Sequence, residues 1–209
     1  MTKVKICGIT NLADALLATD LGADMLGFNF FSGSRRFIGK RASHITKGLP
    51  DAVRKVGIFV NQEITEIVEA VETAGLDLVQ LHGEETPDFV AELGCHISSD
   101  LIKAFRVGPG FDTGSVRDYP VEYVLFDSLS VTGDRGGTGE SFDWTIANSL
   151  SVSSKVLFLA GGLNPLNVAE AVRQVCPFAV DVASGVESVP GKKDPEKMAA
   201  FIKNAKNAL

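Results

Sequence analysis

Short runs of apolar residues alternate along the chain with stretches whose apolar positions recur at helical spacing. The apolar runs are short enough for strands, and they are nearly continuous rather than alternating with polar residues. Such strands, separated by helices, indicate a parallel sheet that is covered by helices on its outer face. Eight strands are predicted on this basis, at residues 4–7, 25–31, 56–60, 78–82, 101–105, 123–127, 156–160 and 178–182.

Capping residues mark the ends of several predicted helices. Asn11 precedes a helix that begins at Leu12, and Gly75 closes an amphipathic helix over Ile64–Ala74. An Asn-Pro pair predicts a further helix over residues 164–175, and an Asp-Pro pair predicts the last one over residues 194–208.

Eight strands in 209 residues leave about 26 residues for each strand and its helix, close to the minimum for a parallel return. This spacing predicts a (βα)₈ TIM barrel, with eight parallel strands and outer helices, at the short end of its size range. A doubly wound open sheet is the alternative. No linker or low-complexity tract divides the chain, so residues 1–209 are predicted to form a single catalytic domain. The long polar loops at 32–41 and 128–140 are candidate active-site loops.

Composition narrows the function classes. The net charge of −6 argues against nucleic-acid binding and requires that an anionic substrate be held by local donors. No apolar run is long enough to cross a membrane. Three cysteines without paired spacing, and no cluster of histidines, argue against disulfides and zinc. A cytoplasmic protein that acts on a small molecule without a metal is expected.

Candidate chemistry begins at the first strand. Side chains alternate along a strand, so Lys5 and Cys7 share one face, and Cys7 is the last side chain before the turn at Gly8. In a parallel α/β fold, ligands bind at this end of the strands. Lys5 and Asp181 of the last strand are both expected to point into the barrel and to form an ion pair, because an unpaired buried charge is costly. The ammonium of Lys5 would also favour the thiolate form of Cys7.

Two glycine turns end the last two predicted strands. Gly161 and Gly162 follow one strand, and Ser184 and Gly185 follow the other. Glycine permits close approach of the backbone to a ligand, and the loops after strands seven and eight of a barrel are its usual phosphate site. A phosphate-binding site is therefore predicted here, against the alternative of two ordinary tight turns.

Other polar residues stand at the same predicted edge. Asp127 ends the sixth strand, so its carboxyl group would face the barrel mouth together with the Cys7 thiol and offer an acid beside a base. Arg36, in the second loop, carries a guanidinium that suits a carboxylate. Gln80 and His82 end the fourth strand and could line the pocket; the alternative is that His82 is a hydrogen-bonded histidine of the core or the rim.

These motifs together resemble phosphoribosylanthranilate isomerase of tryptophan biosynthesis, and the resemblance runs in order along the whole chain. The matching segments are 5–10, 22–28, 34–36, 60–61, 80–83, 126–127, 136–144, 160–163 and 181–187. Two positions depart from the family pattern: Arg35 stands where proline is common, and Ala183 stands where serine is common. Either could alter a loop or one phosphate hydrogen bond.

The resemblance implies an Amadori rearrangement of N-(5-phosphoribosyl)anthranilate, with no cofactor and no metal. By this resemblance Asp127 is the acid that opens the ribose ring, and Cys7, with a lowered pKa, is the base that removes a proton from C2. Arg36 would bind the anthranilate carboxylate. The remaining expected substrate-binding residues are Gly161, Gly162, Ser184, Gly185, His82 and Asp181. The chain would be a monomer or a homodimer.

Two other functions remain open from the residues. One is another sugar-phosphate isomerase or epimerase on the same barrel, although such epimerases generally use a metal or paired carboxylates. The other is a non-catalytic protein that binds a phosphorylated ligand. The joint presence of Cys7, Arg36 and Asp127 favours an enzyme.

Overall fold

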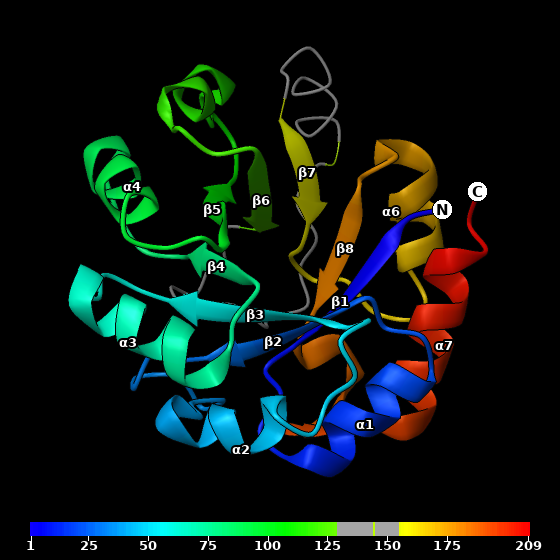
Figure 1. Cartoon of the computed structure of the whole chain (residues 1–209). Coiled ribbons are helices and arrows are strands. Elements are labelled where there is room, and N and C mark those ends of the chain that lie inside the picture. Colours follow the sequence, from blue (N-terminus) through cyan, green and yellow to red (C-terminus); the bar gives the residue numbers. More distant parts are fainter. Residues whose placement is uncertain (129–143, 145–154) are drawn as a thin grey trace.

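A computed structural model describes residues 1–128, 144 and 155–209 of the chain. Its eight main strands are all parallel and close into a barrel in sequence order, ringed by helices (Figure 1). The TIM barrel predicted from the sequence is therefore confirmed, and the open sheet is excluded because β1 pairs with β8. The strands are β1 (Lys3–Cys7), β2 (Met25–Asn29), β3 (Arg54–Phe59), β4 (Leu78–Leu81), β5 (Asp100–Val107), β6 (Tyr123–Ser128), β7 (Val156–Leu159) and β8 (Ala179–Val182).

The helices that follow these strands differ in length and type. The α-helices are α1 (Leu12–Asp20), α2 (Ala42–Thr46), α3 (Ile64–Ala74), α4 (Pro87–Gly94), α6 (Val168–Val175) and α7 (Pro195–Lys206). The short 3₁₀ helices are η1 (Gly39–Arg41), η2 (Thr113–Asp118) and η4 (Ser184–Val186). A small antiparallel hairpin of β9 (Glu187–Val189) and β10 (Lys192–Lys193) follows β8. The sequence pattern did not predict this hairpin, and β5 is followed by η2 where an α-helix was expected.

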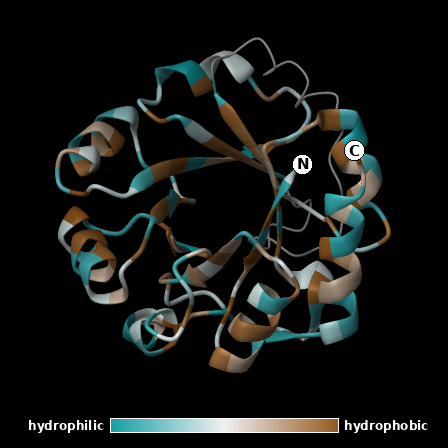
Figure 2. Ribbon diagram, turned by 45° about the vertical axis from the view of Figure 1, so that its right-hand side comes forward, coloured by the Kyte–Doolittle hydropathy of each residue, from teal (hydrophilic) through white to brown (hydrophobic). Residues whose placement is uncertain are grey.

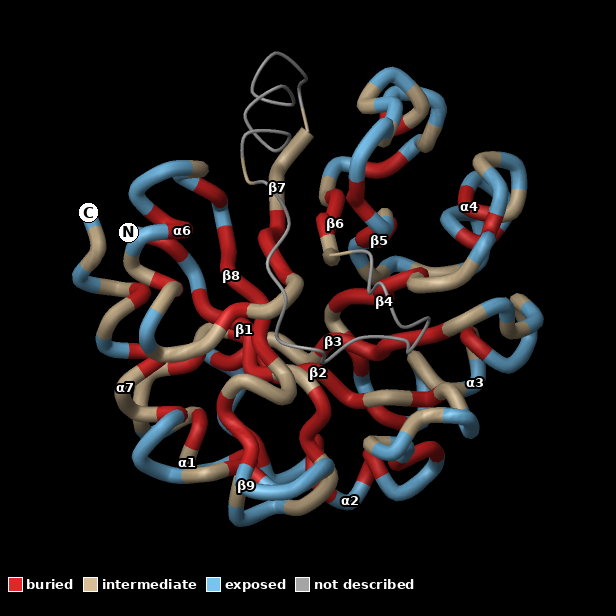
Figure 3. The backbone as a smooth tube through the Cα atoms, turned by 180° about the vertical axis from the view of Figure 1, so that it is seen from behind, coloured by how far each residue is buried: buried red, intermediate tan, exposed pale blue. Residues whose placement is uncertain are grey.

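Alternation along the strands produces two apolar regions. Outward-facing residues such as Ile6 and Phe28 are buried under the helices, whereas Met25, Leu125 and Phe158 belong to a separate cluster inside the barrel. Figure 3 shows the central parts of the strands mostly buried and the outer loops largely exposed. Hydrophobic and hydrophilic stretches alternate around the helical ring in Figure 2, as expected for helices with one buried face. No helix within the described ranges has the length and apolar character needed to span a membrane.

Capping explains several helix boundaries and one error in the predicted boundaries. Asn11 accepts a hydrogen bond from the Asp14 backbone N–H at 2.8 Å, and Gly75 ends α3 with a φ of 58°. The helix predicted to begin at Asn164 begins only at Val168. Asn164 instead forms a local turn, in which its side-chain oxygen accepts from the Leu166 backbone N–H at 2.8 Å. This competition between side chain and helix is typical of asparagine.

The structure describes one of the two candidate active-site loops and only the first residue of the other. The loop at 32–41 contains turns and ends in η1, which leads directly into α2. The loop at 128–140 lies outside the described residues except for Ser128, and so does most of the matching segment 136–144.

Candidate active site

A cleft of about 570 Å³ opens at the carboxyl ends of the barrel strands. All but one of the site residues predicted from the sequence line it. Those that do are Cys7, Arg36, His82, Asp127, Gly161, Gly162, Asp181 and Ser184. The thiol and the carboxyl group that the acid–base hypothesis requires are therefore brought to the same opening. No group of three or more His, Cys, Asp or Glu side chains in the described ranges is placed to hold a metal ion.

Cys7 is the last residue of β1 and is half-buried. Its strand neighbour in the barrel is Gly27 of β2. A Cβ atom at position 27 would lie 2.8 Å from the Cys7 sulfur, which is far inside van der Waals contact. Gly27 therefore provides the space that the thiol occupies at the mouth.

The charge environment of Cys7 corrects one expectation. Burial raises the pKa of the Cys7 thiol, and the nearby Asp181 carboxylate raises it further. The cations Lys5, Lys193 and Arg36 favour the thiolate, but they do not reverse the effect of burial. The lowered pKa expected for Cys7 is therefore wrong for the protein without ligand, because removal of the sulfur from water outweighs the surrounding positive charge.

The ion pair predicted between Lys5 and Asp181 is confirmed. The Lys5 ammonium is completely buried and lies 2.9 Å from Asp181 Oδ2. It also donates a hydrogen bond to Gln80 Oε1 at 2.7 Å. Burial alone would lower the pKa of Lys5, but Asp181 and Cys7 raise it above 10.5, so this lysine is a cation. The second carboxylate oxygen of Asp181, Oδ1, is buried and has no hydrogen-bond partner in the described part of the chain.

Asp127 lies on β6 with two nitrogen-bearing side chains beside it. His82 Nε2 is 3.4 Å from Asp127 Oδ2, and His82 Nδ1 is 2.8 Å from Gln80 Nε2. Arg106, at the end of β5, is the direct strand neighbour of Asp127 and also lines the cleft. The acid candidate is thus held among polar groups at the mouth, with only part of its side chain exposed.

Arg36 is held by a carboxylate of the protein itself. Its Nε and Nη2 atoms donate to the two oxygens of Glu187 at 2.8 and 2.7 Å. Glu187 also accepts from the buried Lys193 ammonium at 3.0 Å. Lys193 in turn donates to the backbone carbonyl oxygen of Cys7 at 2.6 Å. This ion-pair cluster connects the wall that carries Arg36 to the strand that carries the thiol.

The two glycine turns lie against neighbouring parts of the cleft wall. Gly161 and Gly162 both have positive φ angles, 86° and 66°, which favour glycine. The backbone N–H groups of Gly161, Gly162 and Ser184 donate no hydrogen bond within the described ranges, so they are available to an anion. Gly185 is the exception among the predicted residues. In the described structure it packs behind the wall against Leu163, outside the cleft lining.

The sequence prediction missed three charged residues of the site. Arg106 could have been found, because it continues the inward-facing alternation of β5 after Ile102 and Ala104. Glu187 lies in segment 181–187, which matches the family pattern, but no role was predicted for it. Lys193 carried no sequence signal, since the hairpin that returns it beneath the mouth was not predicted.

A closed parallel barrel that gathers a thiol, a carboxyl group, cationic side chains and backbone amides without partners in the described ranges at its carboxyl end belongs to the class of TIM-barrel enzymes that act on small anionic substrates. Comparison with known proteins identifies the family within this class. The profile of the family N-(5'-phosphoribosyl)anthranilate isomerase matches residues 4–204. A relative of that name from Citrifermentans bemidjiense is 49% identical over 207 residues, which covers 99% of this chain and 98% of the relative.

Solved structures agree with the sequence comparison. The crystal structure of phosphoribosyl anthranilate isomerase from Thermotoga maritima is 42% identical, with a TM-score of 0.90 and 99% coverage of both chains. Another structure of such an isomerase, in complex with reduced 1-(o-carboxyphenylamino)-1-deoxyribulose 5-phosphate, has a TM-score of 0.88 at 41% identity and 99% coverage of both chains. The chain belongs to the N-(5'-phosphoribosyl)anthranilate isomerase family and is an isomerase of tryptophan biosynthesis.

Proposed function

We propose that the chain carries out the isomerisation by general acid–base catalysis, with Asp127 as the acid and Cys7 as the base. The observation that supports this assignment is that both side chains, from β6 and β1, line the same cleft beside free backbone amides. Asp127 donates its proton to the furanose ring oxygen, and the bond between that oxygen and C1 breaks. The nitrogen lone pair forms a C1=N double bond, which leaves a cationic Schiff base.

The second step moves the double bond. Cys7 removes the proton from C2, and the electron pair of that C–H bond forms C1=C2 while the nitrogen regains its lone pair. The Asp127 carboxylate takes the proton of the C2 hydroxyl group of the resulting enolamine, and the Cys7 thiol passes its proton to C1, which gives the aminoketose. Positioned proton transfer of this kind contributes about 10²–10⁴-fold to the rate.

The timing of charge formation suits a base that is neutral at rest. Burial keeps the pKa of Cys7 high in the protein without ligand, so the thiol is protonated when the substrate enters. The Schiff base brings a positive charge close to the sulfur, and an opposite charge lowers the pKa of a thiol. The thiol would release its proton to bulk water through the open cleft, so the thiolate would form when C2 is ready to lose its proton.

Anchoring at both ends orients the sugar between acid and base. The phosphate would bind the free amides of Gly161, Gly162 and Ser184. The anthranilate carboxylate would bind Arg36, whose Nη1 is not used by Glu187 in the described contacts. Asp181 Oδ1, a buried acceptor without a partner in the described structure, would accept a hydrogen bond from a substrate hydroxyl group.

The wider setting is also proposed. We infer that residues 1–209 form one catalytic domain, because the barrel closes between the first strand and the last. All three cysteines are free thiols, and the proposed base requires a reduced sulfur, which supports a cytoplasmic location. A Thermotoga maritima relative is described as dimeric, so a homodimer is the first oligomeric state to test by light scattering.

The acid–base assignment is tested with Cys7→Ala and Asp127→Asn. Turnover is followed by the fluorescence change as freshly prepared phosphoribosylanthranilate is consumed. Each variant is expected to lose about 10²–10⁴-fold in kcat while it keeps its melting temperature within a few degrees. The exposed Cys95→Ala variant is the control for loss of a thiol and should keep full activity. Near-normal turnover of either site variant would overturn its assigned role.

A further inference from the structure

Five polar side chains form a row across the mouth of the barrel. The row runs from Asp181 on β8 through Lys5 on β1 and Gln80 on β4 to His82 and then Asp127 on β6. Successive nitrogen–oxygen or nitrogen–nitrogen distances are 2.9, 2.7, 2.8 and 3.4 Å. Cys7 stands beside the same Lys5, so one buried ammonium is connected to both proposed catalytic groups.

Hydrogen-bond direction along this row is fixed by chemistry. An ammonium can only donate, so the Gln80 atom that faces Lys5 is the carbonyl oxygen. The amide nitrogen of Gln80 is then turned toward His82, where it donates to Nδ1. A nitrogen that accepts a hydrogen bond carries no proton. The proton of a neutral His82 ring is therefore on Nε2, the atom that faces Asp127.

Burial makes this order rigid. Lys5 is completely buried and Gln80 is 1% exposed, so water does not compete for their hydrogen bonds. Rotation of the Gln80 amide by 180° would place its NH₂ group against an ammonium, where two donors repel each other. A proton on His82 Nδ1 would meet the Gln80 NH₂ group in the same way. The tautomer is thus determined by the charge of Lys5, two residues away along the row.

We propose that Gln80, anchored by Lys5, is a positioning residue that fixes His82 as the Nε2–H tautomer, and that His82 thereby keeps the transferable proton of Asp127 on Oδ1. This proposal rests on the proposed role of Asp127 as the acid. A donor at His82 Nε2 requires Asp127 Oδ2 to accept, so the carboxyl proton resides on the other oxygen. The opposite tautomer would present a bare nitrogen to Asp127 and draw the acidic proton away from the substrate. The 3.4 Å separation fits a contact that shortens in the substrate complex.

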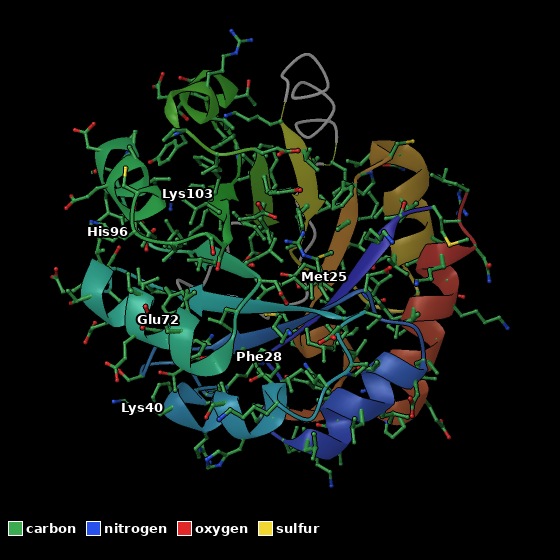
Figure 4. All side chains as sticks on the ribbon, in the orientation of Figure 1. Met25, Phe28, Lys40, Glu72, His96 and Lys103 are labelled. Carbon is green, nitrogen blue, oxygen red and sulfur yellow. The ribbon has the colours of Figure 1, made fainter. Side chains whose placement is uncertain are left out.

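The tautomer is measured directly by proton–nitrogen correlation spectra of ¹⁵N-labelled protein without ligand. The chain has three histidines, and His44 and His96 are exposed, so they supply reference signals (Figure 4 shows His96 at the outer edge). His82 is assigned by the loss of its signal in His82→Gln. The expected result is an unprotonated Nδ1 and a protonated Nε2 for His82. A protonated Nδ1 would overturn the proposal.

Variants of Gln80 test whether this residue sets the tautomer. Gln80→Glu replaces the donor that faces Nδ1 with an acceptor, and the His82 signal is expected to change to a protonated Nδ1. Gln80→Met keeps the shape but removes both hydrogen bonds, and His82 is expected to show averaged signals like those of His96. An unchanged His82 spectrum in both folded variants would refute the positioning role of Gln80.

Kinetics separate positioning from a structural role. Glutamine can place its amide nitrogen where the imidazole Nε2 stands, whereas leucine cannot donate. His82→Leu is expected to lower kcat about 10–10²-fold with KM within about twofold, and His82→Gln is expected to recover most of that loss. His96→Gln is the matched control and should leave kcat and KM unchanged. Equal kcat for all three variants would contradict the proposal.

The two hypotheses fail differently. If Asp127→Asn keeps its activity, the proposed acid is wrong even if the His82 tautomer is as expected. If Asp127→Asn is inactive but His82 carries its proton on Nδ1, the acid role stands and the positioning role of Gln80 is refuted.

Discussion

Substitution of Gly185 by alanine tests the proposed phosphate site without changing a catalytic side chain. A Cβ atom at position 185 would lie 3.0 Å from the carbonyl carbon of Leu163 and 3.1 Å from Cα of Asn164, and closer still to the Leu163 carbonyl oxygen. Carbon atoms in ordinary contact are about 3.5–4.0 Å apart, so the two carbon contacts alone require the turn at Gly185 and the loop after β7 to separate by roughly 0.5–1 Å, and the contact with the Leu163 oxygen requires more. Both neighbours are backbone, so neither can turn aside as a side chain would.

A displacement of about 1 Å in a group that positions substrate can cost about 10²-fold in rate. We therefore expect Gly185→Ala to lower kcat/KM by about 10–10²-fold, mostly through a higher KM. The reason is that the backbone amides after β7 and after β8 no longer fit the same phosphate group. The assay is steady-state fluorescence kinetics, with inorganic phosphate as a competitive inhibitor that should also bind more weakly. Gly94→Ala is the control, since a Cβ at that position meets only a side-chain atom of Leu101 at 3.7 Å. Unchanged KM and unchanged inhibition by phosphate in folded Gly185→Ala would refute the proposed phosphate-binding site.

Two further predictions concern the charged groups around the site. Partial burial alone would raise the pKa of Glu187, but Arg36 and Lys193 hold the pKa below 4.5. The Glu187 carboxylate therefore stabilises the fold above pH 4.5. That contribution is lost as the pH falls through the lowered pKa. Melting curves between pH 7 and pH 3 should show a smaller acid loss for Glu187→Gln than for the unaltered chain, and parallel curves would contradict this. Lys5→Met leaves a buried Asp181 carboxylate without its cation and should cost about 3–5 kcal/mol in urea unfolding, with partial recovery in Lys5→Met/Asp181→Asn. If the free energy of unfolding of Lys5→Met lies within about 1 kcal/mol of that of the unaltered chain, Lys5 is not the main partner of the Asp181 carboxylate.

The barrel could be predicted because its signals are local and repeated. Continuous apolar strands and capped helices recur at a spacing that admits few other folds, and alternation along β1 correctly placed Val4 and Ile6 outside and Lys5 inside. The pairing of Lys5 with Asp181, 176 residues apart, followed from the cost of an unpaired buried charge.

The errors arose where side chains or distant segments decide the outcome. Asn164 forms a side-chain turn that delays α6, and propensity alone does not reveal that the helix begins only after Asn167. The pKa of Cys7 is set by the balance between burial and three cations, one of which arrives on the unpredicted β10 hairpin. Arg36 was correctly placed at the cleft, but its bidentate contact with Glu187 depends on a residue 151 positions away.

The central claim is that Cys7 and Asp127 reach neighbouring atoms of one sugar whose phosphate is bound after β7 and β8. A crystal structure of this chain with the reduced, unreactive analogue of the aminoketose product tests it most directly. We expect the phosphate on the amides of Gly161, Gly162 and Ser184, the Cys7 sulfur in contact with C2, and the Asp127 carboxyl group within hydrogen-bond distance of the former ring oxygen. A bound analogue with its C1 and C2 atoms beyond reach of both side chains would contradict the account.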